Sequence, residues 1–84
     1  MNEVQIKEVI FKALKRIAPE ADPEGLPPGK NVREALDIDS YDFLMFLVGL
    51  NEELGVDVPE ADYGKLITMD DIVGYMSARV ADKA

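Results

Sequence analysis

Apolar residues recur at three- and four-residue spacing along most of this chain, and this spacing restricts its fold more than any other feature. Such spacing is typical of one face of an α-helix, whereas a strand would alternate apolar and polar residues. It predicts helices over residues 3–17, over residues 40–54 and from about residue 69 onward. A short fourth helix is expected from Pro59 to about Lys65, because proline suits the first turn of a helix.

The residues that flank these segments are typical helix ends. Asparagine, aspartate and threonine are favoured N-caps, and they stand here as Asn2, Asp39 and Thr68. Asp42 follows Asp39 by three residues, so we expect it to be the acidic member of a capping box. Gly55 is the expected stop signal of the second long helix.

Residues 19–39 form a long first loop that contains four of the five prolines. Proline and glycine argue against a regular element there, apart from a short helical turn at about residues 32–36. The loop has four apolar residues that are expected to fasten it to the core, namely Leu26, Val32, Leu36 and Ile38. We therefore predict a single all-α domain over residues 1–84, a small four-helix bundle with three main helices, one short helix and this loop.

The chain has no cysteine and no histidine, which limits the chemistry it can perform. It lacks the usual general base and the strongest protein nucleophile, so we do not expect an enzyme. A Cys/His metal site is excluded. Asp37 and Asp39 match the first and third positions of a calcium-binding EF-hand loop, but Tyr41, Asp42 and Val48 break the pattern, so no metal site is expected.

The formal net charge is −8, and from Glu34 to Asp62 there are nine acidic residues and no basic one. Such a surface repels nucleic acid and anionic membranes and attracts basic protein surfaces. The longest apolar run, residues 43–50, is far shorter than the roughly 20 residues that span a bilayer. The N-terminal residues lack the pattern of a signal peptide, so we expect a cytoplasmic protein, and a monomer.

The helix over residues 40–54 has two apolar faces. One is a complete core stripe made of Phe43, Phe46, Leu47, Leu50 and Leu54. The other face consists of Tyr41, Leu44, Met45 and Val48. A bundle of this size is not expected to bury both faces, so we interpret the second as an exposed partner-binding surface. The alternative is that the loop over residues 19–39 covers it.

Ser40 stands at the start of this helix, where a serine is most often a cap. Because Asp39 can do the capping, the Ser40 hydroxyl is predicted to be free, at the helix end that favours anions such as a phosphate ester. Without a histidine to activate it, Ser40 is better read as the substrate of another protein than as a catalyst.

Three segments together resemble the acyl carrier protein family, and they cover nearly the whole chain. Residues 36–42, LDIDSYD, resemble the Asp-Ser-Leu attachment motif of that family. Residues 51–59, NEELGVDVP, resemble the acidic end of its second helix and the entry into its short third helix. Residues 65–71, KLITMDD, resemble the lead into its fourth helix.

The resemblance implies that a phosphopantetheinyl transferase attaches 4′-phosphopantetheine from coenzyme A covalently to Ser40, with Asp39 as part of the motif. The thiol of that arm would carry acyl intermediates as thioesters. The resemblance also implies a core that opens to shelter an acyl chain, with walls expected at Phe46, Leu50, Ile67 and Ile72.

Two positions depart from the family pattern. Tyr41 stands where leucine is usual, and Met45 stands where the family normally has an acidic residue. These departures favour a dedicated carrier in a fatty acid, polyketide or related pathway. Its partners would be acyl-activating or acyl-transferring enzymes with basic and apolar surfaces. The alternative function is an unmodified acidic helical interaction module, in which Ser40 only starts a helix.

Overall fold

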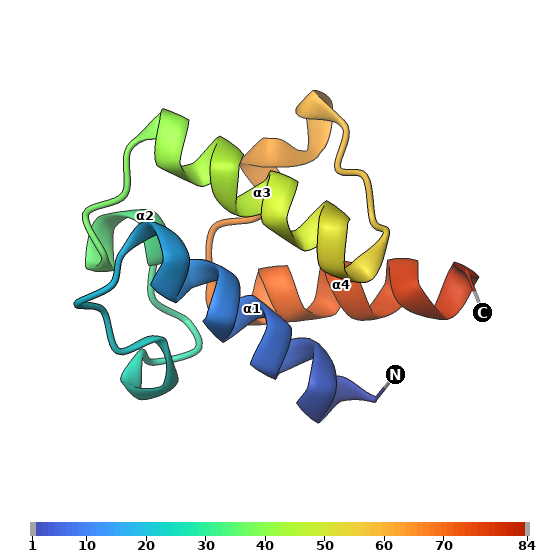
Figure 1. Cartoon of the computed structure of the whole chain (residues 1–84), viewed down its shortest axis with the longest axis horizontal. Coiled ribbons are helices and arrows are strands. Elements are labelled where there is room, and N and C mark those ends of the chain that lie inside the picture. Colours follow the sequence, from blue (N-terminus) through green and yellow to red (C-terminus); the bar gives the residue numbers. More distant parts are fainter. Residues whose placement is uncertain (1, 84) are drawn as a thin grey trace.

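The computed structural model describes residues 2–83, so Met1 and Ala84, the ends of the expected domain, lie outside it (Figure 1). Three long helices form the bundle: α1 (Glu3–Ile17), α3 (Ser40–Leu54) and α4 (Met69–Lys83). The connections contain three short ones: the 3-10 helix η1 (Pro23–Gly25), α2 (Val32–Ala35) and the 3-10 helix η2 (Glu60–Lys65). The all-α bundle predicted from the apolar spacing is confirmed. None of these helices is long and apolar enough to cross a membrane.

Local hydrogen bonds of side chains fix the N-terminal ends of α1 and α4. The Asn2 Oδ1 accepts a hydrogen bond from the Gln5 N–H, and the Gln5 Oε1 accepts one from the Asn2 N–H in return. The Thr68 Oγ1 accepts from the Asp71 N–H, and the Asp71 carboxylate accepts from the Thr68 N–H. Hydrogen bonds from Thr68 hold the pKa of the Asp71 carboxyl below its usual value. Both predicted N-caps therefore exist, each as a reciprocal capping box.

The core lies where α1 packs against α3 and α4. Each long helix contributes one buried stripe, as the spacing predicted. The fully buried large side chains of these stripes are Ile10 and Leu14 of α1, Phe46 and Leu50 of α3, and Ile72 and Met76 of α4. Because these stripes face inward together, the remaining faces of α3 are left to the surface.

The loop over residues 19–39 is fastened to the start of α4. The Val32 N–H donates to the Ile67 carbonyl at 2.9 Å, and the Asp70 N–H donates to the Pro28 carbonyl at 3.2 Å. Val32 and Ile38 are buried, and Leu26 and Leu36 pack against the core as expected. These contacts explain how a loop this long is held in so small a domain.

The expectation that prolines exclude a regular element throughout this loop is wrong at one place. Pro23 starts the single turn η1, where its missing N–H has no intrahelical partner to lose. The short helical turn expected at about residues 32–36 is present as α2.

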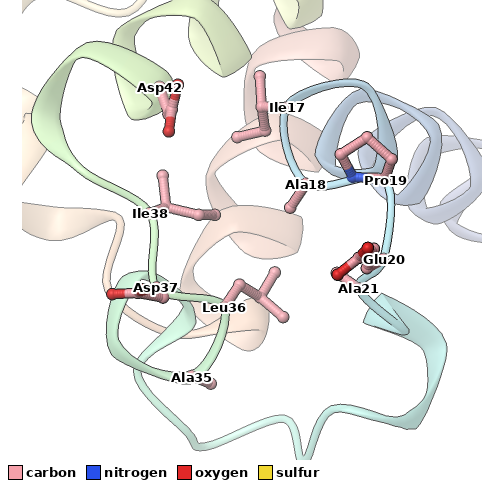
Figure 2. Close-up of a pocket in the computed structure, with 10 residues that line it drawn as sticks. All are labelled: Ile17, Ala18, Pro19, Glu20, Ala21, Ala35, Leu36, Asp37, Ile38 and Asp42. Carbon is pink, nitrogen blue, oxygen red and sulfur yellow. The ribbon is translucent and has the colours of Figure 1, made fainter.

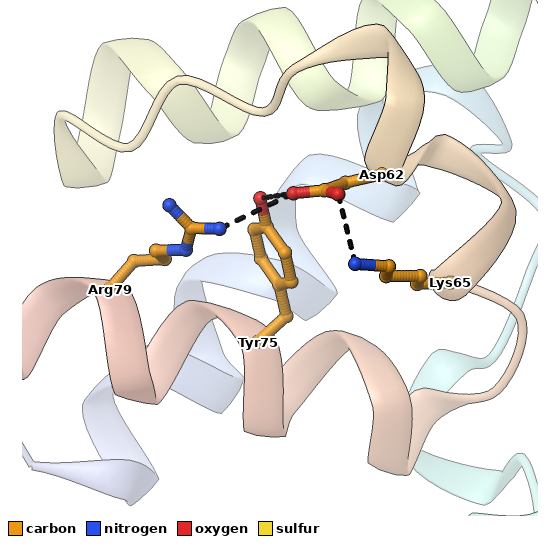
Figure 3. A network of polar contacts seen from close by, with 4 residues as sticks. All are labelled: Asp62, Lys65, Tyr75 and Arg79. Atoms are coloured by element: carbon orange, nitrogen blue, oxygen red, sulfur yellow. Dashed lines mark hydrogen bonds and ion pairs between the residues drawn. The ribbon is translucent and has the colours of Figure 1, made fainter.

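A polar network joins η2 to α4, as Figure 3 shows. The Tyr75 hydroxyl donates to the Asp62 Oδ2 at 2.7 Å, and the Arg79 Nη2 lies 3.3 Å from the same oxygen. The Lys65 Nζ lies 3.1 Å from the Asp62 Oδ1. The hydrogen bond from Tyr75, followed by that from Lys65, holds the pKa of Asp62 below its ordinary value of 3.8. Asp62 therefore binds Tyr75, Lys65 and Arg79 in its ionised form.

This network generates a pH-dependent prediction. Because the folded pKa of Asp62 is lowered, its contribution to stability is complete above pH 3.8 and is lost as the pH falls through the folded pKa. We expect Asp62→Asn to unfold at a lower temperature than the wild type at pH 7, and the two curves to converge below about pH 4. Thermal unfolding followed by circular dichroism measures this. Glu60→Gln, an exposed change in the same helix, should show no such convergence; a constant gap for Asp62→Asn across the pH range would contradict the assignment.

Candidate functional site

Asp39 caps the N-terminus of α3, and Ser40 is the first residue of that helix. The Asp39 Oδ1 accepts a hydrogen bond from the Asp42 N–H at 2.8 Å. The prediction that Asp39 is the N-cap is confirmed. The second half of the expected capping box is wrong, because the Asp42 side chain makes no bond to the Asp39 N–H. The side chain of Asp42 is one methylene group shorter than that of the glutamate that usually accepts the hydrogen bond from the N-cap N–H in a capping box.

The Ser40 side chain has no capping role. Ser40 is exposed, and its Oγ accepts a hydrogen bond at 3.0 Å from the Nη2 of Arg33. The predicted exposure of the hydroxyl is confirmed, but the hydroxyl is not free of protein contacts. An oxygen that accepts from a guanidinium keeps its own proton available to a base that approaches from solvent.

The backbone that leads into α3 brings α2 beside Ser40. Asp37 has a φ of 54°, in the left-handed region that aspartate tolerates better than most residues. The turn there points Ile38 into the core, and the Ile38 N–H donates to the Arg33 carbonyl at 2.9 Å. This bond fixes Arg33 relative to the start of α3.

The second apolar face of α3 is exposed. Tyr41 is 69% exposed, and Leu44, Met45 and Val48 are each about 40% exposed. The loop over residues 19–39 does not cover them, so the alternative of a covered face is wrong. Asp39, Glu52 and Glu53 are also exposed on α3 or at its start. The surface that begins at Ser40 is therefore apolar along its length and acidic at both ends.

A hollow of about 530 Å³ lies next to this helix start, between the end of α1 and the end of α2 (Figure 2). Ile17, Leu36 and Ile38 line it together with Asp42 from the first turn of α3. None of the four side chains expected to form the walls of a cargo site lines this hollow.

The expected cargo walls do not all lie in the core. Phe46, Leu50 and Ile72 are fully buried, whereas Ile67 is 45% exposed. Ile67 therefore lies outside the closed core, where its neighbour Leu66, 1% exposed, is buried. The place of Ile67 in the wall of an opened core stays a prediction. The Ile67 carbonyl accepts the bond from Val32, and this pairing turns its side chain toward a second surface hollow beside Arg33 and Tyr63.

Among the side chains that the structure describes, those of residues 2–81, no group of three or more acidic residues is placed to hold a metal ion. Ser77, the other serine, has an Oγ that is buried and makes no hydrogen bond, so it is closed to any second protein. The fold and the site together define a small helical domain that presents one exposed serine at the tip of a helix.

Comparison with known proteins identifies the family. The chain is 33% identical over 81 residues to an acyl carrier protein of Thermosynechococcus vestitus, covering 96% of this chain and 99% of that protein. It is 29% identical to an acyl carrier protein of Lactobacillus acidophilus over 86% of this chain and 94% of that protein. It is 28% identical to one of Campylobacter curvus over 84% of this chain and 86% of that protein. The chain belongs to the acyl carrier protein family.

Two further comparisons found no relative: neither a family model nor a solved structure matches the chain.

Reasoning from sequence missed Arg33. The available signal was its charge, because Arg33 is the last basic residue before the acidic stretch that runs from Glu34 to Asp62. Arg33 and Ser40 are seven positions apart in the sequence, and the turn at Asp37 between them brings them together. Helical periodicity carries no information about a contact made across a loop.

The exposure of the apolar face generates a stability prediction. Met45→Glu should change the free energy of unfolding by less than about 1 kcal/mol, because surface substitutions seldom do more. Phe46→Ala, at the next position, should cost about 3–5 kcal/mol, because it empties a fully buried site. Urea unfolding of both variants measures the difference. Equal losses would show that Met45 is part of the core.

Proposed function

We propose that this chain is a carrier that holds acyl groups as thioesters on a 4′-phosphopantetheine arm attached to Ser40. The observation that supports this most directly is that two adjacent residues have different roles at the start of α3. Asp39 satisfies the helix N-terminus, and Ser40 is left exposed. When bound, the arm supplies a thiol, which this cysteine-free chain lacks.

The surroundings of Ser40 fit a phosphate ester. The N-terminal end of a helix has a partial positive charge that favours anions. Ser40 is the first residue of the 15-residue α3, and the Arg33 guanidinium contacts its Oγ. No other serine or threonine lies on α3, so Ser40 has the only aliphatic hydroxyl of this helix.

Attachment requires a second protein. In the proposed transfer the Ser40 Oγ forms a bond to the phosphorus of the pantetheine half of coenzyme A. The bond from that phosphorus to the adenosine 3′,5′-bisphosphate half breaks. The serine proton passes to a base on the transferase, because this chain has no histidine to accept it. A divalent metal on the transferase would neutralise the leaving group.

The attachment is tested by intact-protein mass spectrometry. After incubation with coenzyme A, Mg²⁺ and a broad-specificity phosphopantetheinyl transferase, the wild type should gain the mass of one arm. Ser40→Ala should gain none. Ser77→Ala is the matched control and should be modified like the wild type, because it removes only a buried hydroxyl without a partner.

If Ser40→Ala still gains the mass of the arm, the attachment site is another residue. No addition to the folded wild type would leave the unmodified interaction module, which uses the same apolar face, as the remaining function.

The exposed apolar face of α3 is proposed as the partner surface. Tyr41, Leu44, Met45 and Val48 start one residue after Ser40 and follow the helix for two turns. A protein that reaches Ser40 would cover this face, and exposed acidic groups lie at both of its ends. The fitting partner therefore has an apolar centre with basic residues around it. Met45 adapts to several such surfaces, because methionine is flexible and polarizable.

The transferase itself serves as the test partner. Met45→Glu should lower kcat/KM for arm transfer by about tenfold, mainly through KM, because a buried contact of an interface is commonly worth more than 1 kcal/mol. Val4→Glu is the matched control: Val4 is 64% exposed on α1, away from Ser40 in the sequence, and should leave kcat/KM unchanged. Equal effects of the two variants would remove the case for a partner surface on α3.

A further inference from the structure

We propose that Arg33 is a positioning residue that binds the phosphate of the arm once Ser40 is modified. This inference rests on the function proposed above and adds one residue to the site. Arg33 lies on α2, outside the attachment motif, and its Nη2 is 3.0 Å from the Ser40 Oγ.

Modification changes what the guanidinium binds. In the unmodified protein, Arg33 donates to a neutral hydroxyl oxygen. After esterification, that oxygen is a poor acceptor, while the charged phosphate oxygens lie two bonds away from it. An arginine bound to a charged phosphate makes shorter and stronger hydrogen bonds than one bound to a neutral hydroxyl. Its planar fork of N–H groups also permits two such bonds at once.

The guanidinium is already held in position. Its Cζ lies 5.3 Å from the centroid of the Phe43 ring, one turn into α3. The helix that bears it is anchored by the buried Val32 and by the bond from the Val32 N–H to the Ile67 carbonyl. A cation that is held before the anion arrives loses less conformational freedom when it binds.

The negative charges around Ser40 would make a contact between Arg33 and the added phosphate favourable. A phosphate on Ser40 would join Asp37, Asp39 and Asp42, which stand within three residues of it. Between Glu34 and Asp62 the chain supplies no cation to offset these charges. Arg33 is within 4.0 Å of no carboxylate among the side chains described, residues 2–81, whereas Lys65 and Arg79 both pair with Asp62. Arg33 is therefore available to the incoming anion.

A thermodynamic cycle tests the inference. The melting temperatures of the unmodified and the modified protein are measured for the wild type, Arg33→Gln and Lys30→Gln at low ionic strength. In Arg33→Gln, modification should lower the melting temperature by roughly 2–5 °C more than it does in the wild type, because the added phosphate then lacks its counter-charge. Lys30→Gln removes the same charge from an exposed side chain that makes no hydrogen bond to Ser40, and should behave as the wild type does.

A spectroscopic readout separates this contact from a general effect on stability. The ³¹P resonance of the modified protein should shift in Arg33→Gln and stay in place in Lys30→Gln. Arg33→Lys, which keeps the charge and loses the fork, should recover part of the stability but not the wild-type resonance.

The outcomes distinguish the two proposals. If the wild type takes up no arm, the proposed function fails and this inference fails with it. If the arm is added to Ser40 but Arg33→Gln matches Lys30→Gln in both melting temperature and ³¹P shift, only the role of Arg33 is overturned.

Discussion

The hydrogen bond from the Asp42 N–H to the Asp39 carboxylate sets where α3 begins, and much of the molecule follows from that starting point. A helix that starts at Ser40 directs Phe43, Phe46, Leu47 and Leu50 into the core. The same rotational phase places Tyr41, Leu44, Met45 and Val48 outside. Because the aspartate caps the helix, the side chain of the serine next to it is not needed as a cap. One local bond therefore separates the structural residue from the residue available for modification.

The long connection before α3 has a second role beside linking two helices. Its backbone bonds to residues 67–70 fasten α2 to the start of α4, and the left-handed turn at Asp37 then leads into the cap. This arrangement places Arg33 at the N-terminus of α3, where the other charged residues nearby in the sequence are carboxylates. In the proposed function, the acidic surface would attract basic partners, while Arg33 would offset the negative charge next to a phosphate on Ser40.

Much of this structure was predictable from sequence because its signals are local. The caps at Asn2, Asp39 and Thr68 and the stop at Gly55 fix helix ends through bonds to neighbouring residues. Sequence reasoning did not predict the direction of side chains whose orientation depends on distant contacts. Ile67 and Leu66 are both apolar and adjacent, and only the pairing of residue 67 with Val32 decides which one enters the core. Likewise, the contact between Arg33 and Ser40 depends on a loop conformation that no periodicity encodes.

The central claim is that the Ser40 hydroxyl is the point at which this chain receives its cargo-bearing group. Peptide-level mass spectrometry of the protein purified from its own cells tests this most directly. We expect the peptide that contains Ser40 to carry the phosphopantetheine arm, in part with an acyl group on its thiol. An unmodified Ser40 in protein taken from cells that modify their other carrier proteins would contradict the claim.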